Sequence, residues 1–211
     1  MSYLIVCSVA LLASALTFFS GFGLGTLLLP AFALFFPVGE AVALTAVVHF
    51  LNGLFKLALT ARHADRRVVL LFGVPACVMA VAGAWVLTWL VDSHPLVVYV
   101  IAGHAFEVTA VKLVVGLLLL VFASLELIPR FQTLAFGARY LPVGGLLSGF
   151  LGGLAGMQGA LRSAFLARAG LSKEAFIGTG VVIACLIDVS RLAVYSATGD
   201  YNGVHGNAGL V

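Results

Sequence analysis

Charged residues are scarce in this sequence. Only 9% of the 211 residues are charged, and none occurs between Tyr3 and Val38. Soluble globular domains carry about 25% charged residues, because water must wet their surface. The composition therefore excludes soluble enzymes, nucleic-acid-binding proteins and disordered chains, and it predicts an integral membrane protein whose partner is the lipid bilayer rather than a nucleic acid.

The residue patterns of catalytic and metal sites are also missing. The three cysteines and five histidines stand apart from one another, without the spacing of metal ligands. No Walker pattern occurs, and Ser148 lacks the glycine two residues before it that an intramembrane serine protease would need. No basic residue precedes the first apolar run, which argues against a removable signal peptide. We expect neither enzymatic activity nor a cofactor.

Long apolar runs are abundant. A membrane-spanning helix needs roughly 20 apolar residues, and this rule predicts about six spans in an all-α helix bundle. The first run, from Leu4 to Phe36, is too long for one straight helix and is interrupted by glycines and Pro30. We expect a span followed by a broken or re-entrant half-helix there. The other spans are expected at about 41–61, 68–91, 111–127, 141–166 and 175–197.

The stretch at 95–110 does not fit a helix that crosses the membrane. Two β-rich runs flank Gly103 in this stretch. This pattern predicts a β-hairpin outside the bilayer, with helical continuation of the fourth span as the alternative.

Basic residues are distributed unevenly among the loops. With six spans, one side carries five arginines and the other carries Lys112, Arg168 and Lys173. Because cytoplasmic loops are enriched in basic residues, we expect both chain ends in the cytoplasm of a cell (inner) membrane protein. The same rule accounts for the net charge of +3 without an anionic partner.

An offset of 134 residues relates two parts of the sequence. It pairs Gly25 with Gly159, Glu40 with Glu174 and Thr45 with Thr179. Four predicted spans separate the pairs, which predicts a parallel internal repeat. The first repeat would occupy 1–128, and an apparently incomplete second repeat would occupy 141–211 with two spans. We expect a C-terminally truncated fragment, and a genuine six-span protein is the alternative.

Two glycine-rich segments interrupt the apolar runs. In the second segment, glycines four residues apart predict close packing of helices. In the first segment, Gly21, Gly23 and Gly25 are two residues apart and lie on different helix faces. For that segment, packing and an unwound stretch whose amides face an anion are equally well supported.

Polar residues within the predicted spans are the remaining candidates. A charge at the bilayer centre costs roughly 2.5 to 3.5 kcal/mol, so such residues usually face a cavity or a partner. Lys56 and Arg191 lie close enough to span ends to snorkel. A structural ion pair between Asp188 and Arg191 is at least as well supported as a transport role for these residues. A lone histidine such as His49 is more typical of a residue that forms a hydrogen bond between helices than of a proton relay. Arg162 directly follows a glycine break and is the strongest candidate.

The glycine motifs and the segments after them resemble the TauE/SafE sulfite exporter family. The matching residues are Gly21-Phe22-Gly23-Leu24-Gly25-Thr26 with Pro30, the segment 40–45, the segment 146–156 and the segment 170–180. The resemblance implies two four-helix repeats around a central site. Family members have about eight spans, whereas this sequence predicts about six. It also implies a permease for sulfite or organosulfonates.

We therefore expect a permease that moves small sulfur-containing anions by alternating access, and the alternative is a non-transporting membrane scaffold or assembly factor. The residues leave the identity of the anion and the oligomeric state open. The predicted substrate-binding residues are Gly21, Gly23, Gly25, His49, Asn52, Lys56, Gly156, Gln158, Gly159, Arg162, Asp188 and Arg191.

Overall fold

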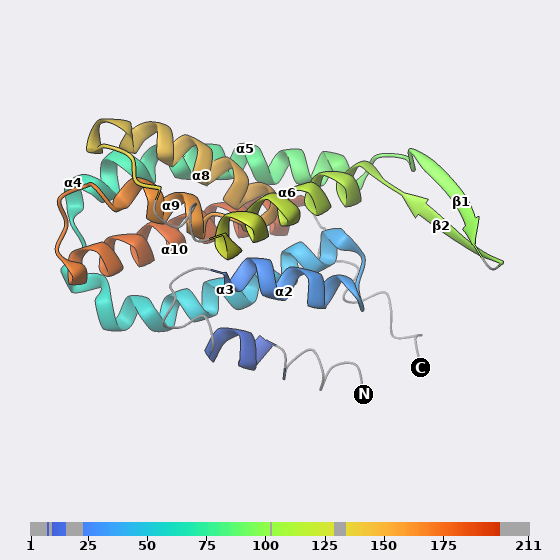
Figure 1. Cartoon of the computed structure of the whole chain (residues 1–211), viewed down its shortest axis with the longest axis horizontal. Coiled ribbons are helices and arrows are strands. Elements are labelled where there is room, and N and C mark those ends of the chain that lie inside the picture. Colours follow the sequence, from blue (N-terminus) through green and yellow to red (C-terminus); the bar gives the residue numbers. More distant parts are fainter. Residues whose placement is uncertain (1–7, 9, 16–22, 102, 129–133, 199–211) are drawn as a thin grey trace.

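The computed structural model of the chain describes residues 8, 10–15, 23–101, 103–128 and 134–198. These residues form a helix bundle from which one β-hairpin projects (Figure 1). Four helical stretches are long and apolar enough to cross a membrane, namely Val38–His63, Arg66–Val91, Ala110–Leu127 and Lys173–Thr198. A predominantly helical membrane protein is confirmed, whereas six full spans are not found among the described residues.

Local sequence explains where several helices begin. The Asp65 side chain accepts a hydrogen bond from the Val68 amide at 2.9 Å and so caps α4 (Arg66–Val68). A π-helical turn, η2 (Val69–Gly73), joins α4 to α5 (Val74–Val91). This turn lies directly before Pro75, whose ring nitrogen cannot donate the hydrogen bond of a regular helix. The π-turn therefore allows one long helix to accommodate the proline.

The predicted hairpin is confirmed. Strand β1 (Val97–Ile101) pairs antiparallel with β2 (His104–Val108), and Gly103 adopts a left-handed conformation with a φ of 81° in the turn. Glycine adopts this conformation without steric cost. Helix α6 (Ala110–Leu127) starts after the hairpin, capped by Thr109, so helical continuation through this stretch is wrong.

The predicted fifth span, 141–166, folds back on itself. Helix α8 (Leu141–Ala155) ends at Gly156, and α9 (Gly159–Leu166) returns along it. The Phe136 amide donates to the Ala164 carbonyl at 3.0 Å, so the end of α9 lies beside the start of α8. Fifteen residues span about 22 Å, which is less than the roughly 30 Å of a bilayer core. A single crossing is therefore the wrong prediction for this segment.

The glycine-rich face of α8 packs against α5, as predicted. A Cβ atom on Gly145 would collide with a backbone carbonyl of η2, and a Cβ on Gly149 or Gly153 would collide with a backbone carbonyl of α5. The carbonyls belong to residues one turn apart, so the two helices run parallel in close contact. These glycines serve helix packing.

Helices α3 (Val38–Thr60) and α10 (Lys173–Thr198) run antiparallel. Near its start, α10 approaches the end of α3, because a Cβ on Gly178 would meet the Thr60 carbonyl oxygen at 2.5 Å. Further along, His49 of α3 contacts Asp188 of α10. The predicted parallel orientation of the two related segments is therefore wrong. The prediction failed because it counted 141–166 as one crossing.

A short helix precedes each of these long helices. Helix α2 (Leu24–Ala33) begins after Gly23, whose φ is 91°, and leads into α3. The structure has a short helix after the glycines, as predicted, whereas most of the span expected before it, and Gly21, lie outside the described residues. A Cβ on Gly25 would lie 3.0 Å from the Gly156 carbonyl oxygen, so α2 and α9 begin near each other inside the bundle. From there they run toward opposite ends.

The reversal of the chain at Gly156 also decides at which end of the bundle the loop 168–174 lies. The Gly137 backbone forms a β-bridge with Arg168, and the Asp65 backbone amide donates to the Thr179 hydroxyl oxygen at 2.8 Å. The loop 168–174 therefore lies at the same end of the bundle as Arg62, Arg66 and Arg67. The sequence had placed this loop at the opposite end, and that prediction is wrong.

Candidate functional site

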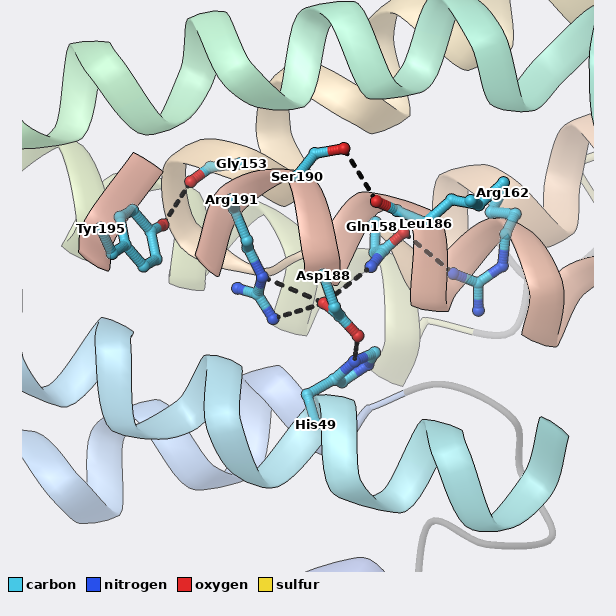
Figure 2. A network of polar contacts seen from close by, with 9 residues as sticks. All are labelled: His49, Gly153, Gln158, Arg162, Leu186, Asp188, Ser190, Arg191 and Tyr195. Carbon is cyan, nitrogen blue, oxygen red and sulfur yellow. Dashed lines mark hydrogen bonds and ion pairs between the residues drawn. The ribbon is translucent and has the colours of Figure 1, made fainter. Parts of the chain in front are cut away.

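A polar network occupies the interior between α3, α9 and α10 (Figure 2). Asp188 is fully buried at its centre. One carboxylate oxygen, Oδ2, lies 2.6 Å from His49 Nδ1. The other, Oδ1, accepts from Arg191 Nε at 3.0 Å and lies 2.8 Å from Arg191 Nη2. The predicted ion pair between Asp188 and Arg191 and the predicted helix-bridging role of His49 are both confirmed.

Gln158 extends the network from the break between α8 and α9. Its amide nitrogen lies 3.5 Å from Asp188 Oδ1, and its amide oxygen accepts from Arg162 Nη1 at 3.1 Å. The Gln158 backbone carbonyl also accepts from the Ser148 hydroxyl at 3.2 Å. Gln158 and Ser148 are fully buried, so the break is a fixed part of the interior. Arg162 is only 6% exposed and lies in the first half of α9.

Arg191 is fully buried, yet part of its guanidinium group lacks a partner. Its Nη1 atom has no hydrogen-bond partner among the described residues. The same atom packs against Gly156, where a Cβ would lie only 2.5 Å from it. Snorkelling of Arg191 toward a span end is therefore the wrong interpretation. A buried donor without a partner is costly, so this atom calls for a partner that the described residues do not supply.

Thr45 has a second buried group of this kind. Its hydroxyl is without a hydrogen-bond partner among the described residues, and its side chain is 1% exposed. Thr45 lies one turn before His49 on α3 and therefore on the same helix face. Because α3 and α10 are antiparallel and His49 faces Asp188, Thr45 lies on the part of α3 that faces the Arg191 side of the network.

The buried charges do not balance. Among the described residues, the charged side chains in the fully buried class are Arg162, Asp188 and Arg191. Two guanidinium groups and one carboxylate leave one positive charge in excess when His49 is neutral. A neutral His49 can donate its Nδ1 hydrogen to the Asp188 carboxylate, which only accepts. An uncompensated buried cation is costly, and a bound anion would compensate it.

The starts of two half-helices lie beside these charges. The first amides of α2 and α9 have no partner within their own helices, and each helix start carries partial positive charge. Gly25 and Gly156 allow the two breaks to approach each other, since a Cβ at either position would crowd a neighbour. The arrangement combines the amides of two helix starts, two arginines and one threonine hydroxyl, which are groups that bind small oxyanions.

The structure brings together seven of the predicted site residues. They are Gly25, His49, Gly156, Gln158, Arg162, Asp188 and Arg191. Gly23 and Gly159 mark the starts of α2 and α9. Asn52 and Lys56 are half-buried further along α3, after His49. Sequence reasoning missed Thr45 and the half-buried Glu126, which accepts a hydrogen bond from Thr26 at 2.7 Å.

Comparison with protein families matches residues 6–211 to "Sulfite exporter TauE/SafE". The match covers essentially the whole chain. A search of curated proteins and a search of solved structures each find no match. The chain therefore belongs to the TauE/SafE sulfite exporter family, a family of membrane transporters.

Proposed function

We propose that the protein is a permease that moves sulfite or organosulfonates across the cell membrane. One observation carries this proposal: two buried arginines face one buried carboxylate beside the starts of two half-helices, and Arg191 Nη1 has no partner among the described residues. A small oxyanion would supply the missing negative charge and accept the free hydrogen bonds. Membership of the family supports the sulfur-containing substrate class.

We further propose that the segments 24–60 and 159–198 form an inverted repeat. Each consists of a short helix that starts inside the bundle and a long helix that crosses it, and the long helices are antiparallel. Inverted repeats of this kind place a substrate site at their interface. Alternating access would follow from rocking of α2 and α3 against α9 and α10. The contact between His49 and Asp188 joins the two parts.

The distribution of charge supports one orientation. At one end of the described bundle lie Arg62, Arg66, Arg67, Arg139, Arg168 and Lys173, whereas the hairpin end carries Lys112. By the positive-inside rule, the end with six basic residues faces the cytoplasm and the hairpin lies on the opposite side.

The experiment that tests the function is anion flux into proteoliposomes. The wild-type protein should take up labelled sulfite or a labelled sulfonate, and Arg162→Gln should lower the flux at least tenfold while the amount of folded protein is unchanged. Arg139→Gln is the matched control, because Arg139 is exposed and remote from the network. If the wild-type protein moves no oxyanion of a broad panel, the permease proposal is wrong and the scaffold interpretation gains support.

A further inference from the structure

His49 joins the two parts of the proposed inverted repeat. Its Nδ1 atom lies 2.6 Å from Asp188 Oδ2, and the Asp188 side chain is fully buried. The His49 side chain is 17% exposed, and its other ring nitrogen, Nε2, makes no hydrogen bond to a described residue. Figure 2 shows the ring reaching from α3 to the carboxylate on α10. One ring nitrogen is therefore fixed to the buried network, while the ring lies at the accessible edge of that network.

The hydrogens of this contact can be counted. A carboxylate only accepts, so Nδ1 carries a hydrogen and donates it to Asp188. In the neutral ring the second nitrogen is then an acceptor, and in the protonated ring both nitrogens donate. A proton can therefore bind at His49 Nε2 without breaking the contact with Asp188. Histidine suits this task, because its ordinary change of charge falls between about pH 5 and 8.

We propose, resting on the permease function above, that His49 binds a proton that is transported together with the anion. Arg162 and Arg191 already outnumber Asp188 in the buried network, and a proton on His49 adds a second excess positive charge. A bound anion offsets this charge and favours the proton, and the proton in turn favours the anion. The coupling is reciprocal, as linkage between two binding sites requires.

The position of His49 also connects the proton to the movement of the two parts. His49 belongs to α3, whereas Asp188 belongs to α10, so their contact crosses the interface that must rock during alternating access. A proton on His49 converts the hydrogen bond of a neutral ring into an ion pair, which is stronger. The two parts are therefore held together most firmly when both the proton and the anion are bound.

Further titratable groups lie on the described elements that pack against α3. Lys56 lies two turns after His49 on α3 and interacts electrostatically with Arg162. The others are Glu40 on α3 itself, Lys173, Glu174, Cys185, Arg191 and Tyr195 on α10, Arg62 and His63 on η1, Lys112 and Glu126 on α6, and Cys77 on α5, whereas α2 has none. Among the described residues, the charged group that bonds to His49 is Asp188, which Arg191 also binds. An anion at Arg191 therefore acts on the proton through the carboxylate that the two side chains share.

Nitrogen NMR of the histidine ring tests the proton site by binding alone. Replacing the other four histidines by glutamine makes His49 the single histidine and leaves the network intact; His63, His94 and His104 are exposed, and the fourth is His205. Saturating methanesulfonate should make His49 bind its proton at least tenfold more tightly, within the usual range of coupling, so that the ring titrates at a higher pH. Potassium chloride at the same ionic strength is the control and should not shift the titration.

Three results of this titration would overturn the proposal. The first is an unchanged titration of His49 while methanesulfonate is bound. The second is a ring that keeps one protonation state at every pH at which the protein is folded, with and without the anion. The third is a full response in the added variant Arg162→Leu, because the anion would then act from outside the network. If no small anion binds at all, the permease proposal itself fails, and the coupling fails with it.

Uptake into proteoliposomes tests whether the proton moves with the anion. A sulfonate is a strong acid, so a pH gradient at zero membrane potential acts on methanesulfonate uptake only through the protein. An acidic exterior should raise initial uptake at least fivefold in the wild-type protein and in the control His104→Gln, which alters an exposed residue of β2. His49→Gln should not respond to the gradient. An equal response in His49→Gln, or wild-type uptake that ignores the gradient, would overturn the transported proton, whereas no uptake in the wild type would instead refute the permease function.

Discussion

The half-helices α2 and α9 share a backbone design but differ in charge. Both begin beside a glycine break inside the bundle, and each leads into a long membrane-spanning helix. Helix α9 carries Arg162 and is followed by α10 with Asp188 and Arg191, whereas α2 carries no charged residue. At the 134-residue offset, the counterpart of Arg162 is the fully buried Leu28. If the two segments form the proposed inverted repeat, its two copies therefore differ in charge.

Because of this difference in charge, the segments 24–60 and 159–198 would contribute different groups to the proposed site. The second part supplies the buried positive charge, and the first part supplies helix amides, Thr45 and the bridging His49. Glu126 of α6 lies against the first part, away from the network around Asp188. An anion between the breaks would therefore contact both parts, which is what alternating access at a repeat interface requires.

The largest effect concerns the antiparallel orientation of α3 and α10. Labelling from one side of the membrane tests this orientation with an all-or-none result. In a cysteine-free background, single cysteines at Arg67 and Ser172 should react with an impermeant maleimide from the same side. A cysteine at Ser93 should react from the opposite side, because it follows α5 at the hairpin end. If positions 172 and 93 react from the same side, the result would instead support the parallel orientation of α3 and α10 that the sequence predicted.

Glycine substitutions separate the packing glycines from those of the breaks. Gly149→Leu should abolish the folded protein, because its Cβ alone would collide with the Ala76 backbone and nothing flexible can yield. Gly116→Leu is the matched control, since no neighbouring element of the described structure comes within 4 Å of a Cβ there. Membrane abundance and the elution profile in detergent measure the outcome. Normal abundance of Gly149→Leu would refute the close contact between α5 and α8.

Exchanging the counterpart residues Arg162 and Leu28 tests whether the charge difference matters. Arg162→Leu should lower anion flux at least tenfold, with thermal stability retained, because Asp188 keeps Arg191 and His49 as partners when Arg162 is removed. Leu28→Arg should instead destabilise the protein by about 3 kcal/mol, the cost of a charge within the membrane. Normal flux in Arg162→Leu would remove Arg162 from the site.

The smallest effect is expected where the two breaks meet. A Cβ in Gly25→Ala would lie 3.0 Å from the Gly156 carbonyl oxygen, so the two breaks must move apart by a few tenths of an ångström. We expect a destabilisation of about 1 kcal/mol and a flux reduced severalfold, measured by thermal unfolding and by uptake. Gly116→Ala should change neither quantity. An unchanged flux in Gly25→Ala would place the anion away from this contact.

The sequence predicted the elements better than their directions. Apolar runs located α3, α5, α6 and α10, and Gly103 between two β-rich runs located the hairpin. The segment 141–166 has the length and composition of one span, and its reversal at Gly156 depends on tertiary contacts. Phe165 stacks on Phe136 and fills the space at Gly144, and a hydropathy pattern does not reveal such contacts.

The sequence predicted the charged residues of the candidate site, but it did not predict Thr45 or Glu126. Arg162, Asp188 and Arg191 stand out because charges are rare within apolar runs. Thr45 resembles any other small residue of a helix, and its significance comes from a hydroxyl that no described residue pairs with, which only the packed structure reveals. Glu126 lies at the end of an apolar run, where an acidic residue is unremarkable, and its partner Thr26 is 100 residues away in the chain.

The most direct test of the buried positive charge is thermal unfolding of the purified protein with a panel of small anions. A ligand that binds only the native state stabilises it by about 2.7 kcal/mol at one hundred times its Kd. We predict that sulfite or an organosulfonate raises the Tm of the wild-type protein and leaves that of Arg162→Leu unchanged. If no anion raises the Tm of the folded wild-type protein, or if Arg162→Leu responds equally, the proposed anion site is contradicted.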